Sequence, residues 1–202
     1  MIKFLKNHLD FRVYNVTIAA ILTALAIAPC YLYLPERFGW ENGLLENIQM
    51  VVLFVAFYWC MTAKHYKKFF YFAAMVIGIL VLREINCGRT LFFPIESDVY
   101  GPPRFMSWKD IKYGYLAHPL YGLYMAFVAV YFLRNKLFNN LVEIVKEIKL
   151  PIWNILLMIT GMVLGMYAEK ALHNDVFEEI SELLFYVSLA GIIYLYSRIY
   201  QK

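Results

Sequence analysis

Charged residues are scarce in this sequence: Asp, Glu, Lys and Arg make up 17% of its 202 residues, whereas 62% are hydrophobic. A soluble domain of this length carries roughly a quarter charged and about half apolar residues. The scarcity of charge therefore excludes a soluble globular domain and predicts a protein that resides in a lipid bilayer. The aromatic share of 18% fits that environment, because Tyr and Trp favour the headgroup region of a membrane.

Cysteines and catalytic signatures are also few. The three cysteines, Cys30, Cys60 and Cys87, are far apart in apolar sequence, so they resemble small buried hydrophobic residues more than a disulfide framework or a set of metal ligands. The sequence contains no His-Glu-x-x-His motif, nucleophile elbow or Gly-rich phosphate loop. The net charge of +4 comes from basic residues that lie mainly in short loops, so no nucleic-acid partner is predicted.

Six apolar segments approach or exceed the length of about 20 residues with which a helix crosses the hydrocarbon core. They are residues 13–34, 44–63, 69–92, 116–133, 152–172 and 176–197. We therefore predict an all-α fold, in which residues 1–202 form a single transmembrane domain of six helices. Between the fourth and fifth segments, apolar residues at helical spacing over residues 137–148 predict an amphipathic helix on the membrane surface.

The distribution of basic residues predicts the orientation. With both termini on the inner side, that side receives 12 of the 19 basic residues. These are Lys3, Lys6, Arg12, Lys64, Lys67, Lys68, Arg134, Lys136, Lys146, Lys149, Arg198 and Lys202. The positive-inside rule then places both termini in the cytoplasm, and we expect the protein in the bacterial cytoplasmic (inner) membrane.

Two charged motifs interrupt the third and sixth segments. Arg83 and Glu84 stand within the third segment, and Glu178-Glu179-x-x-Glu182 opens the sixth. A charge at membrane depth costs about 3 kcal/mol on insertion scales, so it persists mainly where it is paired, hydrated or used. With a rise of 1.5 Å per residue, both motifs fall in the outer half of the membrane. We therefore predict one site, with Arg83, Glu84, Glu179 and Glu182 as candidate catalytic residues.

Further polar residues are expected at the same depth. Glu46, Arg89 and His118 are candidate ligand-binding residues. Glu169 and His173 are four residues apart, a spacing that aims both side chains from one helix face and is common for paired metal ligands. Together with Glu179 they are candidate ligands for a divalent metal ion.

Acidic residues outnumber basic ones at this depth. Glu46, Glu84, Glu169, Glu178, Glu179 and Glu182 stand against Arg83, Arg89 and Lys170. Protonation, a bound cation, basic groups folded in from the outer loop, or simple exposure to water would each resolve the imbalance. A structural network of ion pairs that locks the helices together is a further interpretation.

Three functions remain open from these residues. One is a metal- or acid/base-dependent enzyme that acts on a lipid-linked or membrane-adjacent substrate. The alternatives are a small-molecule transporter or its substrate-binding subunit, and a membrane scaffold with a buried ion-pair network. Membrane lipids and a small-molecule or lipid-linked ligand are the expected partners.

The charged motifs resemble a pattern found in a family of small, uncharacterised bacterial inner-membrane proteins. The pattern comprises Trp40-Glu41-Asn42-Gly43-Leu44-Leu45-Glu46-Asn47, then Arg83-Glu84-Ile85-Asn86-Cys87-Gly88-Arg89 with Phe92-Phe93-Pro94, and Glu178-Glu179-x-x-Glu182. A Trp often stands in that family where this chain has Cys87. The resemblance implies a location and a topology but no catalytic roles. In size and number of helices the chain also resembles the substrate-binding subunit of energy-coupling-factor vitamin transporters.

Overall fold

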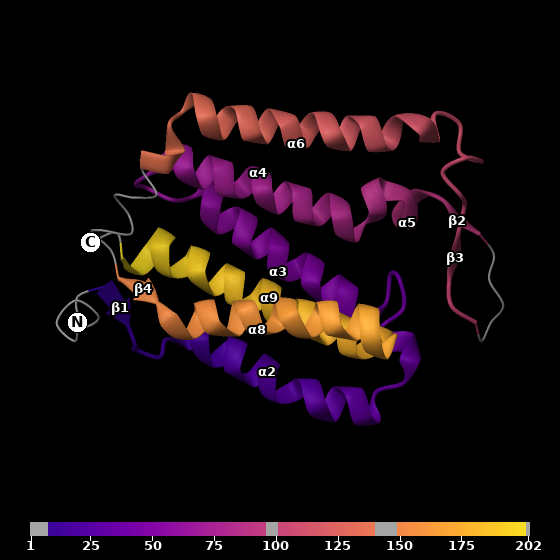
Figure 1. Ribbon diagram of the computed structural model, residues 1–202, viewed down its shortest axis with the longest axis horizontal. Helices are drawn as coiled ribbons and strands as arrows, with labels where there is room; N and C mark the ends of the chain where they lie inside the picture. The colour runs from indigo at the N-terminus through magenta and orange to yellow at the C-terminus, as the bar shows by residue number, and fades with distance from the viewer. Residues whose placement is uncertain (1–7, 96–100, 140–148, 201–202) are drawn as a thin grey trace.

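The computed structural model of the protein describes residues 8–95, 101–139 and 149–200. Its long helices run side by side (Figure 1) and are α2 (Asn15–Tyr33), α3 (Leu44–Met61), α4 (Lys67–Glu84), α6 (Ala117–Arg134), α8 (Ile152–Tyr167) and α9 (Asp175–Tyr194). Five helices in the described residues are long and apolar enough to cross a membrane, and α4 joined to the short helix α5 (Arg89–Phe92) is a sixth candidate. The prediction of a mainly helical protein with several helices suited to span a membrane is confirmed at this level.

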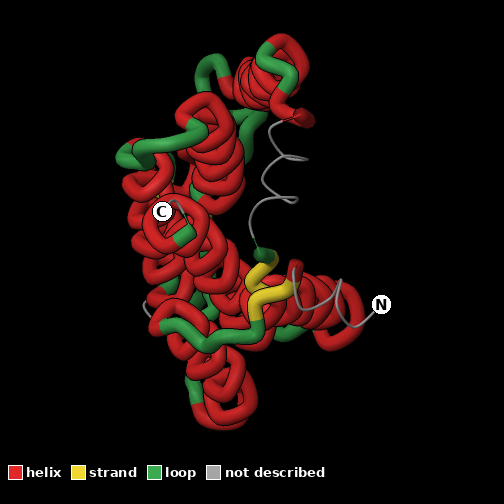
Figure 2. Tube along the Cα trace, turned by 90° about the vertical axis from the view of Figure 1, so that its left-hand side faces the viewer, coloured by secondary structure: helices red, strands yellow, loops and turns green. Residues whose placement is uncertain are grey.

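Helix α9 lies at the centre of the bundle and packs against α2, α3 and α8. Of the 18 consecutive residues that are most apolar in the span containing α9, 61% are buried, and the same share in the span containing α6 is 6%. Helix α6 packs chiefly on α4 and lies at one extreme of an elongated bundle, and α2 lies at the other (Figure 2). The apolar side chains that α6 leaves uncovered are compatible with a helix that spans a membrane.

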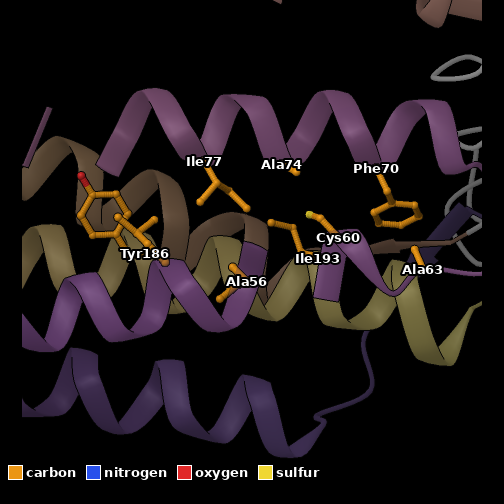
Figure 3. Close-up of a cluster of buried hydrophobic side chains, with 10 residues drawn as sticks. Ala56, Cys60, Ala63, Phe70, Ala74, Ile77, Tyr186 and Ile193 are labelled. Atoms are coloured by element: carbon orange, nitrogen blue, oxygen red, sulfur yellow. The ribbon is translucent and has the colours of Figure 1, made fainter. Parts of the chain in front are cut away.

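Helices α3, α4 and α9 enclose the main hydrophobic core (Figure 3). Small side chains such as Ala56, Ala74 and Ala190 allow the helices to approach closely, while Ile77 and Tyr186 fill the space between them. Cys60 is 1% exposed in this core and forms no disulfide, as expected of a small hydrophobic residue. At Tyr186 this core adjoins a group of polar residues at one end of the bundle.

The predicted third segment is broken near its end. Helix α4 ends at Glu84, and Asn86, Cys87 and Gly88 have φ angles of 44°, 52° and 92°. These left-handed conformations cannot continue an α-helix, so the chain bends by 59° before α5. A short antiparallel hairpin of β2 (Pro94–Ile95) and β3 (Arg104–Phe105) follows, and we call this end of the bundle the hairpin end (Figure 1).

At the opposite end, strands β1 (Leu9–Asp10) and β4 (Leu150–Pro151) pair in parallel. Asp10 is 3% exposed and accepts hydrogen bonds from the backbone and guanidinium of Arg12 and from the hydroxyls of Tyr14 and Tyr200, at 2.8–3.1 Å. This carboxylate therefore joins the start of α2 to the segment that follows α9. Most of the predicted amphipathic helix over residues 137–148 lies outside the described residues; Leu137 at its start is buried.

Replacement of Asp10 by Asn should destabilise the protein by about 2 kcal/mol, because several hydrogen bonds to a charged group are lost. Burial raises the pKa of Asp10, but the hydrogen bonds from Arg12, Tyr14 and Tyr200 outweigh burial and hold that pKa well below its usual range. The folded protein thus favours the carboxylate, and its stabilisation is complete above the unfolded pKa of about 4 and lost as the pH falls further.

The measurement is the free energy of unfolding in mixed detergent micelles at several pH values. The difference between the wild type and Asp10→Asn should shrink below about pH 4. Asp110→Asn, at an exposed position, serves as the control and should change little. A difference between the wild type and Asp10→Asn that does not vary with pH would contradict this account.

Candidate functional site

Four glutamates from three helices meet at the hairpin end. Glu46 comes from the first turn of α3, Glu84 from the last residue of α4, and Glu179 and Glu182 from the first half of α9. We call these four the carboxylate cluster. One oxygen each of Glu84, Glu179 and Glu182 lies within 4.8 Å of the others, the only such group of acidic, His or Cys side chains in the part of the chain that the structure describes.

Neighbouring side chains orient two of these carboxylates. Tyr186, one turn beyond Glu182 on α9, donates its hydroxyl to Glu84 Oε1 at 2.5 Å. The Nε2 of Gln49 donates to both the carbonyl oxygen and Oε2 of Glu179, at 2.8 and 2.7 Å. Because Tyr186 and Gln49 are themselves buried, they fix the direction in which the carboxylates point.

The side-chain amide oxygen of Gln49, Oε1, is a further feature of this region. Gln49 is 0% exposed, and its Oε1 has no hydrogen-bond partner among the described residues. Its amide nitrogen is 2.7 Å from Oε2 of Glu179, so Oε1 belongs to the amide group that orients this carboxylate. A buried acceptor without a donor costs about 1–3 kcal/mol, unless a proton donor or a cation occupies the space before it.

Glu46 connects the cluster to the broken helix. It is 6% exposed and accepts a hydrogen bond from the backbone amide of Asn42, which has a φ angle of 59°. The side chain of Asn42 donates in turn to the carbonyl oxygen of Thr90 in α5 at 2.7 Å. The loop before α3 and the segment after the break of α4 are thereby held together.

Arg83 is the basic residue that contacts the cluster. Its Nη2 pairs with Glu182, and its Nε lies 3.8 Å from Glu84 Oε1. The side chain of Arg83 is 53% exposed, compared with 6% for Glu84 and 17% for Glu182. With one cation and four carboxylates, the cluster has more negative charge than its protein neighbours neutralise.

Arg89 lies beside the cluster rather than in it. Arg83, Asn86 and Arg89 are three residues apart, a spacing that would place them on one face of a continuous α-helix, but the break after α4 ends that spacing. With its amide oxygen turned toward Arg89, Asn86 accepts from Nη2 at 2.8 Å and from Nε at 3.3 Å, and Arg89 Nη2 lies 3.4 Å from Glu41. This group borders the site.

The metal set expected from the sequence is not assembled. Glu169 lies in the π-helical turn Ala168–Leu172, and His173 ends that turn with a φ angle of 49°. The four-residue spacing therefore does not place the two side chains on one α-helical face. His173 is exposed at the hairpin end, and the structure brings Glu179 together with Glu84 and Glu182 instead.

His118 is also outside the cluster. It is exposed in the first turn of α6, and its ring packs edge-on against Trp108 with centroids 5.9 Å apart. Tyr186, in contrast, touches the site but was not among the predicted site residues. The signal was its position four residues after Glu182 and seven after Glu179, which places all three on one face of α9.

Two cavities adjoin these residues. The smaller, of about 140 Å³, is lined by the whole carboxylate cluster together with Arg83, Glu41, Asn86 and Glu178. The larger, of about 410 Å³, lies between α4, α8 and α9; it is lined by Arg83, Glu169, Glu178 and Glu182 and by apolar side chains of the same helices. We call it the lateral cavity. Both cavities are lined by Arg83, Glu178 and Glu182, so they lie next to each other.

Comparisons of the chain with family models, with curated proteins and with solved structures find no match. The chemistry that the site supports is therefore inferred from its geometry. Oxygen donors held close together without an equal number of cations favour the binding of a hard metal ion such as Mg²⁺, Mn²⁺ or Ca²⁺.

Proposed function

We propose that the carboxylate cluster binds a divalent cation and that the protein is a membrane-embedded enzyme acting on a lipid-linked substrate. The observation that carries this proposal is the convergence of Glu84, Glu179 and Glu182 within 4.8 Å. Two oxygens on opposite sides of a cation, with bonds of 2.3–2.6 Å, lie up to about 5 Å apart, so this spacing suits Ca²⁺ or, after slight contraction, Mn²⁺ and Mg²⁺.

The unpaired oxygen of Gln49 supports the same proposal independently. Amide carbonyl oxygens are regular ligands of hard cations, and this one is buried beside Glu179 without a donor among the described residues. The alternative of protonated carboxylates would leave the Gln49 oxygen unsatisfied unless one of those protons pointed toward it.

A bound cation of this kind would supply Lewis acidity, which polarises a phosphoryl or carbonyl oxygen and lowers the pKa of a bound water. Arg83 is placed beside the cluster with half of its side chain exposed. Because a guanidinium has five N–H donors and Glu182 occupies few of them, Arg83 can also hold an anionic group of a substrate. Metal-assisted hydrolysis or transfer at a phosphate of a lipid is the reaction class that fits best.

The proposal includes a topology. The chain has six spans, with the bent pair α4 and α5 counted as one, and lies in the bacterial cytoplasmic membrane. Both termini lie in the cytoplasm and the hairpin end faces outward, as the distribution of basic residues favours. The carboxylate cluster then lies in the outer half of the membrane, where a substrate can arrive from the outer leaflet.

Binding of Mn²⁺ tests the proposal. Purified protein in detergent should bind about one Mn²⁺ per chain, measured by electron paramagnetic resonance, and Glu179→Gln should weaken that binding by more than about tenfold. Glu36→Gln removes a carboxylate from an exposed position on the 3-10 turn Glu36–Phe38 that lines neither cavity, and should bind as the wild type does. Equal binding by Glu179→Gln and the wild type would refute the metal site.

The break after α4 favours a second function, transport of a cation or of a solute coupled to one. Broken spans in secondary transporters expose backbone carbonyls that coordinate ions, and residues 86–88 have the left-handed conformations of such a break. This function predicts ion-dependent uptake into proteoliposomes. The enzyme predicts release of a product from a lipid without net movement of a solute across the membrane.

A further inference from the structure

The lining of the lateral cavity changes from charged to apolar along the helices. Glu169, on the π-helical turn that follows α8, lies at the hairpin end and Met162 on α8 lies seven residues deeper. On α9 Glu178 and Phe185 repeat that arrangement. Seven residues correspond to about 10 Å of helix. On α4, Arg83 lies at the polar end and Leu80 one turn deeper. Three helices thus give the cavity a charged end and an apolar end with the same orientation.

This polarity matches an amphiphile that lies parallel to the helices. Its headgroup would meet the charged end and the beginning of a chain would lie along the apolar end. The volume of about 410 Å³ is within the range of sites that hold small molecules. Met162 and Met166 are each 49% exposed, so the apolar wall on α8 faces the outside of the bundle, which is the lipid side. A membrane lipid can therefore reach the cavity from the bilayer.

The charges at the polar end indicate which headgroup fits. Glu182 is paired with Arg83, whereas Glu169 and Glu178 form no salt bridge with any described residue. The end therefore has two carboxylates in excess and repels a purely anionic headgroup. An ammonium group matches the two glutamates, and Arg83 retains donors for a phosphate beside it.

We infer that the lateral cavity binds a phospholipid with an amine-bearing, zwitterionic headgroup of the phosphoethanolamine type. Glu169 and Glu178 receive the ammonium group, Arg83 receives the phosphate, and the first part of an acyl chain lies along Met162 and Phe185. The inference rests on the proposed function in one respect, because it names the substrate class of that site. The phosphate held by Arg83 would lie next to the carboxylate cluster.

Gly161 and Gly165 explain how α8 leaves room for this ligand while it packs on α9. A Cβ atom at Gly161 would lie 2.6 Å from the backbone nitrogen of Phe185, so the two helices are in direct backbone contact there. A Cβ at Gly165 would lie 3.4 Å from Glu182, which is ordinary van der Waals contact. Both glycines line the lateral cavity, so no side chain from either position occupies it.

Titration with short-chain lipids tests the inference. Protein in detergent would be titrated with dihexanoyl phosphatidylethanolamine, dihexanoyl phosphatidylcholine and dihexanoyl phosphatidylglycerol by calorimetry. We expect the ethanolamine lipid to bind most tightly, because a primary ammonium donates hydrogen bonds that a quaternary one lacks and the glycerol headgroup carries no cation. Glu178→Gln should weaken the binding of the ethanolamine lipid at least about tenfold. Glu169→Gln, on the exposed rim, should also weaken it.

Parallel measurements of Mn²⁺ binding separate this inference from the proposed function. Glu169→Gln should retain Mn²⁺ binding, because Glu169 lines the lateral cavity but not the cavity of the carboxylate cluster. Glu179→Gln should lose Mn²⁺ but retain the ethanolamine lipid. Equal affinities for the three lipids, or unchanged affinity in both Glu178→Gln and Glu169→Gln, would overturn the lipid inference even if Mn²⁺ binds. Selective lipid binding without Mn²⁺ binding would support the lipid site and refute the metal-dependent function.

Discussion

Replacement of Arg83 by Met should destabilise the protein by about 3 kcal/mol. Arg83 is the only basic side chain among the described residues that pairs with Glu84 and Glu182. Its removal leaves carboxylates in a partly buried site without a partner, and the loss of one member of a buried ion pair costs about 3–5 kcal/mol. We expect the lower end of that range, because the side chain of Arg83 is 53% exposed.

The measurement is the free energy of unfolding by SDS titration in mixed micelles, and a second substitution sharpens it. In the double variant Arg83→Met/Glu182→Gln one unpaired carboxylate is gone, so much of the lost stability should return. Arg83→Lys keeps the charge but not the planar guanidinium and should fall between the wild type and Arg83→Met. A double variant less stable than Arg83→Met would show that the pair is not the source of the loss.

Replacement of Gly161 by Ala should destabilise the protein by about 2–3 kcal/mol, although Ala is normally the better helix former. A Cβ atom there would lie 2.6 Å from the backbone nitrogen of Phe185 and 2.8 Å from the carbonyl oxygen of Ser181. Backbone atoms of a packed helix cannot yield as a flexible side chain does, so α8 and α9 must separate. Because α9 carries Glu179 and Glu182, binding of Mn²⁺ should weaken as well.

Gly122 in α6 offers a matched control. A Cβ atom at Gly122 would meet nothing within 4 Å, and α6 lies at the edge of the bundle. Gly122→Ala should therefore leave stability unchanged or raise it by up to about 1 kcal/mol, as the helix propensity of Ala predicts. Similar losses of stability in both variants would mean that the close approach of α8 and α9 does not matter.

The sequence predicts the class of fold and the region of the site well, for simple reasons. Long apolar segments report membrane helices directly, because each must satisfy its own backbone hydrogen bonds in lipid. The location of Arg83, Glu84, Glu179 and Glu182 follows from their depth, since 1.5 Å per residue converts position in a segment into height in the membrane. The structure brings these four residues together.

Local departures from the α-helix account for what the sequence does not predict. The expectations for Arg89 and for Glu169 with His173 all assume helical spacing, and that spacing fails at residues 86–88 and again at Ala168–Leu172. Neither break contains proline, the usual signal of a helix end. The role of Tyr186 was missed for another reason: an aromatic residue in an apolar segment looks like core until its hydroxyl is seen to reach Glu84.

The position of α9 in the chain has a consequence for biogenesis. Every other described α-helix precedes α9 in the sequence, yet α9 contributes the buried centre of the bundle and packs against α2, α3 and α8. Until α9 is inserted, the earlier helices have only their contacts with one another, such as those of α3 and α6 with α4, and lack the central helix of the bundle. Completion of the bundle is then a late event, and a ribosome stalled before Asp175 would leave the inserted helices without their central partner and without half of the glutamates of the site.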